Sequence, residues 1–155
     1  MKIYLVQHGK AMSKKEDPKR PLNENGKEET NRIANFLRTK VEIKFDNIFY
    51  SKKLRAKQTA VIFSKYLSTK NLEEIAGLKA KDDPNKVVDQ INGTSEDLNN
   101  MYVSHLPILN KISDLLLTNS VDNDIIDFHN SAVLCLEGHE NNWNVEWYLP
   151  LDFLR

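Results

Sequence analysis

Short apolar runs alternate along the chain with longer segments in which apolar residues recur every three or four positions. The short runs are rich in strand-forming residues, and we predict strands over residues 2–6, 47–50 and 99–104. A weaker run, Leu72–Leu78, predicts an edge strand. Strands that alternate with helical segments favour a mainly parallel sheet, because parallel strands need long crossover connections.

The segments with helical spacing have clear starting signals. Asn23 is a suitable N-cap for a helix that runs to about Thr39, and a second helix starts near Arg55. A short helix covers Asn85–Ile91. A third main helix starts at Leu106-Pro107, because the first turn does not use the N–H that proline lacks. The apolar positions of the three longer helices are Ile33, Phe36 and Leu37; Ala60, Phe63, Tyr66 and Leu67; and Ile108, Leu109, Ile112, Leu115 and Leu116.

The last part of the chain has a different pattern. Two runs, 132–137 and 143–149, are joined by a short segment that contains a glycine, which predicts an antiparallel hairpin. Trp143, Val145 and Trp147 alternate with polar residues, the period of a half-exposed strand. Together the elements predict an α/β fold: a three-layer sandwich with a mainly parallel central sheet flanked by helices and a C-terminal antiparallel hairpin.

Composition narrows the class of protein. A length of 155 residues predicts a single domain over 1–155. The 22 basic and 22 acidic residues leave no excess of positive charge for a nucleic-acid or membrane partner. The single cysteine, Cys135, allows no internal disulfide and suits a reducing compartment. No run approaches the roughly 18–20 apolar residues of a membrane span, and residues 3–6 are too few for a signal peptide, so we expect a cytoplasmic protein.

Residues with useful chemistry follow three of the predicted strands. The first strand ends in Gln7-His8-Gly9. The second is followed by Ser51 and then by Arg55, and the third ends in Ser104-His105. Ligand sites of open α/β sheets lie beyond the carboxyl ends of the strands, so two histidines and an arginine at these ends predict one pocket. An arginine in the first turn of a helix opposes the helix dipole, which indicates an anion nearby.

Four blocks of the sequence resemble motifs of the histidine phosphatase superfamily. Leu5–Ala11 resembles the first block, an apolar strand followed by Arg-His-Gly, and Ser51–Thr59 resembles Ser-x-x-x-Arg-Ala-x-Gln-Thr. Arg20-Pro21-Leu22 with Asn25-Gly26 resembles the Arg-Pro-Leu-Thr-x-x-Gly segment of the short bacterial branch. Ser104–Pro107 resembles the block with the second histidine. The order of the blocks and the small size match the SixA-like phosphohistidine phosphatases, which implies a phosphoglycerate-mutase-like fold.

The resemblance implies phosphoryl transfer through a histidine, without a metal or other cofactor. His8 would be the nucleophile, with its second ring nitrogen holding a proton against a fixed acceptor. Arg55 and His105 would stabilise the negative charge on the phosphoryl oxygens. Asp17 is the first candidate for the proton donor, and Glu16 is the second. The residues implied in binding phosphate or substrate are Gln7, Gly9, Arg20 and Ser51.

Several lysines lie near the same blocks, and two interpretations of them stay open. They form either a field that attracts an anionic substrate or ordinary solvated loops. These residues are Lys10, Lys14, Lys52 and Lys53.

Gln7 departs from the motif, because the family has an arginine there. Glutamine offers an amide without charge, and losing one transition-state donor typically costs about 10²–10³ in rate. The protein is then either a slow or specialised phosphatase, with Lys10 or Arg20 partly restoring the charge, or a module that binds phosphorylated groups without turnover. We favour a phosphatase acting on phosphohistidine of a partner protein. A phosphomonoesterase acting on small phosphorylated substrates is the enzymatic alternative.

Overall fold

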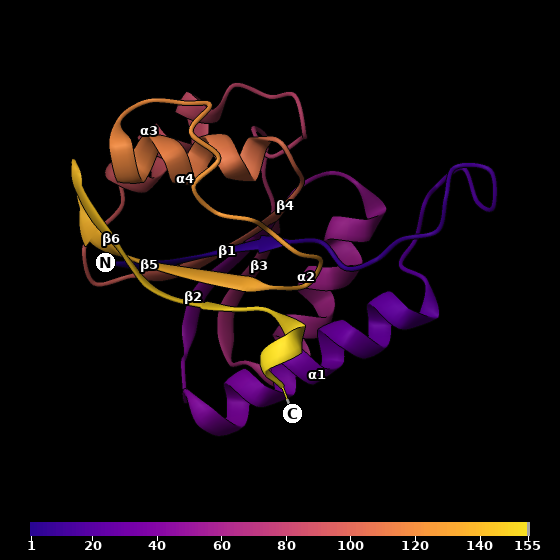
Figure 1. The fold of residues 1–155 in the computed structure, drawn as a ribbon. Helices are drawn as coiled ribbons and strands as arrows, with labels where there is room; N and C mark the ends of the chain where they lie inside the picture. Colours follow the sequence, from indigo (N-terminus) through magenta and orange to yellow (C-terminus); the bar gives the residue numbers. More distant parts are fainter. Residues whose placement is uncertain (155) are drawn as a thin grey trace.

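Within residues 1–154, which the computed structural model describes, six strands form one sheet (Figure 1). Their order across the sheet is β3 (Thr69–Glu74), β2 (Phe45–Tyr50), β4 (Asn99–Ser104), β1 (Lys2–Gln7), β5 (Val133–His139) and β6 (Asn142–Leu149). The first four are parallel to one another, whereas β5 pairs antiparallel with both β1 and β6. The predicted parallel sheet with a C-terminal antiparallel hairpin is therefore confirmed.

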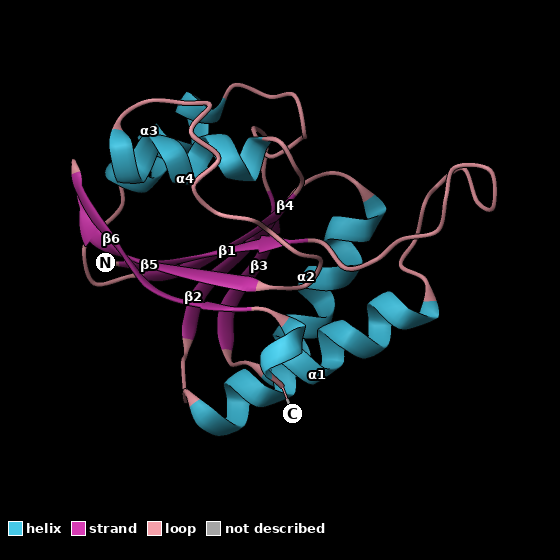
Figure 2. Ribbon diagram, viewed as in Figure 1, coloured by secondary structure: helices cyan, strands magenta, loops and turns pink. Residues whose placement is uncertain are grey.

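Helices cover both faces of the sheet and complete the three layers (Figure 2). On one face lie α1 (Glu24–Lys40) and α2 (Leu54–Tyr66), and on the other lie α3 (Pro84–Asn92) and α4 (Ile108–Thr118). A short 3-10 helix, η1 (Leu151–Phe153), follows β6 and contacts α1. Among residues 1–154, no helix has both the length and the apolar character needed to cross a membrane.

The predicted helix starts are close to the observed ones. The Asn23 side chain caps α1 by accepting a hydrogen bond from the backbone N–H of Gly26 at 2.7 Å. Pro107 stands at the N-cap position of α4, one residue before the first turn in which we expected it.

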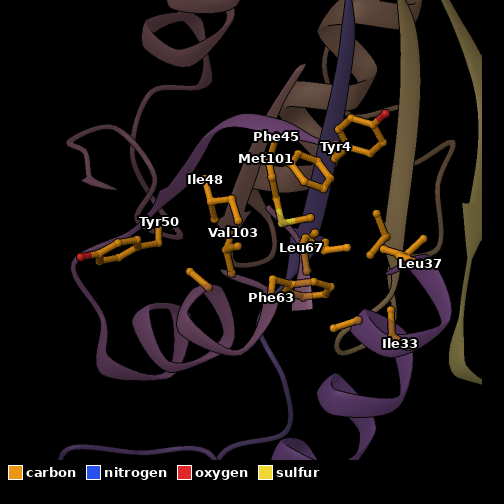
Figure 3. Packing of buried hydrophobic residues seen from close by; sticks show 14 of the residues in the cluster. Tyr4, Ile33, Leu37, Phe45, Ile48, Tyr50, Phe63, Leu67, Met101 and Val103 are labelled. Atoms are coloured by element: carbon orange, nitrogen blue, oxygen red, sulfur yellow. The ribbon is translucent and has the colours of Figure 1, made fainter. Parts of the chain in front are cut away.

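Strand β1 is buried on both faces, as a central strand of a parallel sheet should be. Tyr4 and Val6 belong to the core under α1 and α2, and Ile3 and Leu5 belong to the core under α3 and α4. None of these four side chains is more than 2% exposed. Figure 3 shows the first core, in which Phe63 of α2 packs among side chains of the sheet and of α1. The apolar run at the N-terminus therefore fills two cores at once.

The predicted edge strand exists but is displaced toward the N-terminus. We expected it over Leu72–Leu78, whereas β3 covers Thr69–Glu74. The residues after β3 leave the sheet, and Leu78 packs into the core under α3 and α4 with no exposed surface. Its carbonyl accepts a hydrogen bond from the Ser104 hydroxyl. The apolar character of Leu78 thus reflects core packing rather than strand pairing.

The alternating pattern of β6 does not place its three apolar residues on one face. The pairing of β5 with β6 shifts at Cys135 and Leu136, which face Trp147 and Val145, so that one residue of β6 is extra. Trp143 packs in the core under α3 and α4, whereas Trp147 packs against the opposite core, 5.9 Å from the Tyr4 ring. Val145 is 46% exposed. A β-bulge moves every later side chain to the other face, and sequence alternation does not reveal it.

The core under α1 and α2 gives a direct test of the packing. Phe63→Ala removes a fully buried ring and leaves a cavity, so we expect the free energy of unfolding to fall by about 3–5 kcal/mol in urea denaturation. Phe153, which is 74% exposed, supplies the matched control, and Phe153→Ala should change stability by about 0.5 kcal/mol or less. Equal effects of the two substitutions would contradict this packing.

Candidate active site

The ends of β1, β2 and β4 lie at one edge of the sheet and deliver three loops to one place. The Gln7–Ser104 pair ends the parallel register of β1 and β4, and the ladder continues with a bond from the His8 N–H to the Ser104 carbonyl at 3.0 Å. The Ser51 N–H bonds to the Val103 carbonyl in the same way, at 3.2 Å. As a result the His8 and His105 rings lie 5.0 Å apart, centroid to centroid. The structure thus brings together the strand ends that the sequence analysis connected.

The protonation of His8 is set by its own backbone. Its Nδ1 lies 2.7 Å from the Gly9 carbonyl oxygen, which only accepts hydrogen bonds, so Nδ1 carries the proton. Nε2 is then unprotonated, and its lone pair accepts a hydrogen bond from the Nε–H of Arg55 at 3.3 Å. Burial lowers the pKa of His8 to about 4, and the charges of Arg55 and Arg20 act in the same direction against the Gly9 bond. The ring is neutral at pH 7, with a fixed proton on one nitrogen and a nucleophilic lone pair on the other.

Gly9 is required by packing rather than by an approach to the pocket. A Cβ at this position would lie 2.8 Å from Oγ1 of Thr30 in α1. The Gly9 N–H donates to Thr59 Oγ1 at 2.9 Å, and that hydroxyl donates to the Arg55 carbonyl at 2.8 Å. We expected Gly9 to take part in binding phosphate or substrate, whereas it is not among the residues that line the pocket, and its N–H fastens the His8 loop to α2.

Ser51 lies behind His105 and does not line the pocket. Its hydroxyl is 2.6 Å from Nε2 of His105, and both side chains are buried. Burial, followed by repulsion from a protonated His8 and from Arg55, lowers the pKa of His105 to about 3, so this ring is also neutral. Its Nδ1 is buried and has no partner among the described residues. We expected Ser51 to contact the substrate, whereas its position fits orientation of the His105 ring.

Arg20 enters the site from a loop that is pinned at several points. A bridge pairs Ala11 with Leu22, and the Arg20 Nε–H donates to the Met12 carbonyl at 3.1 Å. The Leu22 N–H donates to the side chain of Gln58 at 2.7 Å, which ties this loop to the helix that carries Arg55. Arg20 has a left-handed backbone with φ of 47°, which is uncommon for a residue other than glycine. The loop is therefore fixed on both sides of Arg20, and the Met12 carbonyl holds the Nε–H of its guanidinium.

The two expected proton donors do not line the pocket. The Asp17 carboxylate accepts a bond from the Lys19 N–H at 2.9 Å, and the Glu16 carboxylate accepts one from the Ser13 N–H at 3.0 Å. Both carboxylates are used to shape the loop before Arg20. Neither is brought to His8 in this conformation.

The pocket itself has a volume of about 460 Å³ and a cationic wall. It contains three basic side chains, and within the described part of the chain none of its lining residues is acidic. Burial and the nearby charge of Arg20 lower the pKa of Arg55, and both cations line this pocket, which suits an anion. The lining residues are Gln7, His8, Lys10, Ala11, Arg20, Asn23, Arg55, Ala80, His105, Leu106 and Asn130.

Asn130 is a site residue that the sequence analysis missed. Its side-chain N–H₂ donates to the His8 carbonyl at 2.9 Å, across 122 positions of sequence. The next residue, Ser131, donates its N–H to the Gln7 carbonyl at 2.9 Å and shares a hydrogen bond of 2.7 Å with the Thr30 hydroxyl. This turn clamps the segment that carries the His8 ring. Asn130 stands in a polar loop before β5, where no local pattern marks it.

The described part of the chain shows no cluster of side chains that could bind a metal ion. Among residues 1–154, no group of three or more histidine, cysteine, aspartate or glutamate side chains is placed to hold a metal ion. His129 and His139 are half-exposed and pair with the nearby carboxylates of Asp127 and Glu96.

A comparison with models of protein families shows which family this chain belongs to. Residues 3–82, slightly more than half of the chain, match the model of the histidine phosphatase superfamily (branch 1). The chain belongs to this superfamily. The matched range holds three of the four blocks found in the sequence, so the predicted family is confirmed and supports phosphatase activity. A search of curated proteins finds no match.

Solved structures of several phosphatases share the fold of this superfamily member. The structure of the protein histidine phosphatase SixA complexed with tungstate has a TM-score of 0.88 and 24% identity, and it covers all of both chains. The α-ribazole phosphatase from Shigella flexneri has a TM-score of 0.79 and 12% identity over 97% of both chains. A phosphoserine phosphatase from Entamoeba histolytica, in complex with 3-phosphoglyceric acid, has a TM-score of 0.71 and 14% identity over 96% of both chains. At these identities the likeness establishes the fold alone.

Gln7 is where this chain departs from the superfamily's motif, and the structure shows its surroundings. Its side chain lines the pocket beside His8. Its Oε1 is buried and has no hydrogen-bond partner among residues 1–154. An arginine at this position would be charged, whereas the Gln7 amide is neutral and its oxygen is an unpaired acceptor.

Burial of the two histidines makes stability depend on pH. The pKa of each is lowered below its unfolded value, so the unfolded chain binds more protons and stability falls as pH falls. We expect this fall to begin near pH 6.5 and to continue through the folded pKa values of about 4 for His8 and about 3 for His105. The part above about pH 5 lies outside the range in which ordinary carboxylates titrate. His105→Gln removes one of the two groups and should make the dependence shallower, as measured by urea denaturation at several pH values. Identical slopes for the variant and the wild type would contradict neutral burial of His105.

Proposed function

We propose that this protein is a phosphatase that removes phosphate from histidine of a partner protein through a phospho-His8 intermediate. The observation that carries the proposal is the state of His8: Nδ1–H is fixed on the Gly9 carbonyl, and the unprotonated Nε2, which accepts only a long bond from Arg55, belongs to a residue that lines a cationic pocket. A neutral imidazole with a fixed tautomer is a suitable nucleophile for a phosphoryl group. Superfamily membership supports the same chemistry.

In the first step, the phosphoryl group enters the pocket with its oxygens toward Arg55 and Arg20. Nε2 of His8 forms a bond to phosphorus while the bond from phosphorus to the substrate's imidazole nitrogen breaks. The substrate ring carries a proton on its other nitrogen before the transfer, and so it leaves as neutral imidazole. The Nδ1–H bond to Gly9 helps to stabilise the positive charge that develops on the ring. Since the arginines are already in place, they stabilise the transition state without having to reorganise.

In the second step, water attacks phospho-His8, and the phosphate leaves with Nε2 recovering its lone pair. His105 is neutral in the free protein, but a phosphate beside it favours the charged ring and raises its pKa. Its ring is oriented by Ser51 from behind. We assign to His105 the stabilisation of phosphoryl charge in both steps.

The choice of phosphohistidine rests on the leaving group. An alkyl phosphate ester needs a good proton donor for its leaving oxygen, and among the described residues no carboxylate lines the pocket. A protonated imidazole leaves more readily and has less need of such a donor. The likeness to a structure described as a protein histidine phosphatase supports this substrate class.

The loss of labelled phosphate from a phosphohistidine-bearing protein tests the proposal. We expect the labelled phosphate to be lost in the presence of the wild-type protein and to persist with His8→Ala, because the variant lacks the nucleophile. Asp17→Asn is the matched control and should retain the activity, since Asp17 does not line the pocket. A chelator should also leave the rate unchanged, because the proposed mechanism uses fixed cationic side chains. Equal loss of label with wild type and His8→Ala would reject the mechanism.

Small phosphate esters define the alternative substrate class. Phosphoserine and α-ribazole phosphatases share this fold, so the same reaction on a small monoester is the second candidate. The ratio of kcat/KM for phosphohistidine to that for a small phosphate ester separates the two. A ratio below one would favour the small substrate.

Gln7 gives the test that separates an enzyme from a binding module. If the mechanism is intact and only one donor is missing, Gln7→Arg should raise kcat by about 10-fold or more, since such donors typically contribute about 10²–10³. Gln7→Lys supplies charge without the planar fork and should give a smaller gain. If neither variant turns over any phosphorylated substrate while both bind vanadate, the protein is a phosphate-binding module.

A further inference from the structure

Lys10 differs from the other two cations of the pocket in how its charge is held. Arg55 donates to His8, and Arg20 is anchored on the Met12 carbonyl. The Lys10 ammonium instead pairs with a carboxylate, at 2.9 Å from Oε1 of Glu29 in α1. The Lys10 side chain is 51% exposed, so the pair is weak and its charge is free to change partners.

Of the three cations in the pocket, Lys10 is the one that lines two neighbouring hollows together with Gln7. Beside the phosphate pocket lies a second hollow of about 360 Å³, and Gln7, Lys10 and Asn130 line both. Glu29 lines only the second hollow, whereas Arg20 and Arg55 line only the first. The Lys10–Glu29 pair therefore spans the boundary between the two spaces, next to the position where positive charge is missing.

The backbone of Lys10 is fixed, so only its side chain has freedom to move. Its carbonyl accepts a bond from the Asn23 N–H at 3.0 Å. A Cβ on Gly26 would lie 2.0 Å from the same carbonyl oxygen, so only glycine fits against it. From this fixed point a flexible four-carbon stem carries the ammonium group.

We propose that Lys10 is a phosphate ligand that replaces the positive charge absent at Gln7, with Glu29 as its partner in the empty site. When a phosphoryl group enters, the ammonium group leaves Glu29 and binds a phosphoryl oxygen. A phosphate dianion competes well, because it carries more charge than the carboxylate and lies among two further cations. This inference rests on the proposed function, since it deepens the account of the same pocket.

Binding of inorganic phosphate and orthovanadate, measured by calorimetry, tests the proposal without any need for turnover. We expect Lys10→Met to weaken binding of both anions by about tenfold or more, as for the loss of a charge-assisted hydrogen bond. Lys27→Met is the matched control: Lys27 also pairs with a glutamate of α1, Glu24, at 3.3 Å, but it does not line the pocket. Its affinity for the anions should stay within about twofold of the wild type, since its pair is exposed.

Two further variants show whether Lys10 acts in place of an arginine at position 7. Gln7→Arg should restore most of the affinity that Lys10→Met loses and should add less in the wild-type background, because the two cations serve one role. Glu29→Gln should strengthen anion binding by removing the competing carboxylate.

The proposal about Lys10 is overturned if Lys10→Met binds the anions as tightly as Lys27→Met, or if the effects of Lys10→Met and Gln7→Arg are fully additive. Failure of the phosphatase proposal looks different. In that case no variant turns over substrate, while the binding differences among the variants persist.

Discussion

The parallel pairing of β1 with β4 is the constraint on which the site depends. It lies at the centre of the sheet, between two apolar cores, and the side chains of both strands are almost entirely buried. The bond from the His8 N–H to the Ser104 carbonyl continues this ladder beyond the strands. Since a shift in register would separate the two histidines, burial of alternate side chains on both faces holds the placement of His8 and His105 as well as the fold.

A second layer of contacts fastens the loops to the helices under them. Gly9 and the loop that begins at Lys10 press against α1 so closely that Gly9 and Gly26 leave no room for a side chain. Gln58 and Thr59 of α2, which belong to the same motif as Arg55, accept hydrogen bonds from the backbone N–H groups of Leu22 and Gly9. These two motif residues thus position the loops, and neither of them lines the pocket.

Burial and charge then determine the chemistry. Removal from water keeps both histidines neutral, and the neighbouring arginines act in the same direction. The same cations make the pocket attractive to a phosphoryl group, whose arrival offsets their repulsion. The neutral Gln7 amide adds no charge to this field. We therefore expect the level of activity, rather than the identity of the fold, to depend on that position and on the lysine beside it.

The sequence by itself determined the elements and their order. Apolar periods marked the strands and helices, the rule of strand ends brought His8, Arg55 and His105 together, and four short blocks indicated the family. Such features are local, because they depend on spacing along the chain. Only the tertiary structure decided the contacts between distant segments: Ser51 behind His105, Asn130 on the His8 carbonyl, and Glu29 beside Lys10. It also decided the bulge in β6 and the position of Asp17 outside the pocket wall, because packing and register, rather than local pattern, select which remote side chains meet.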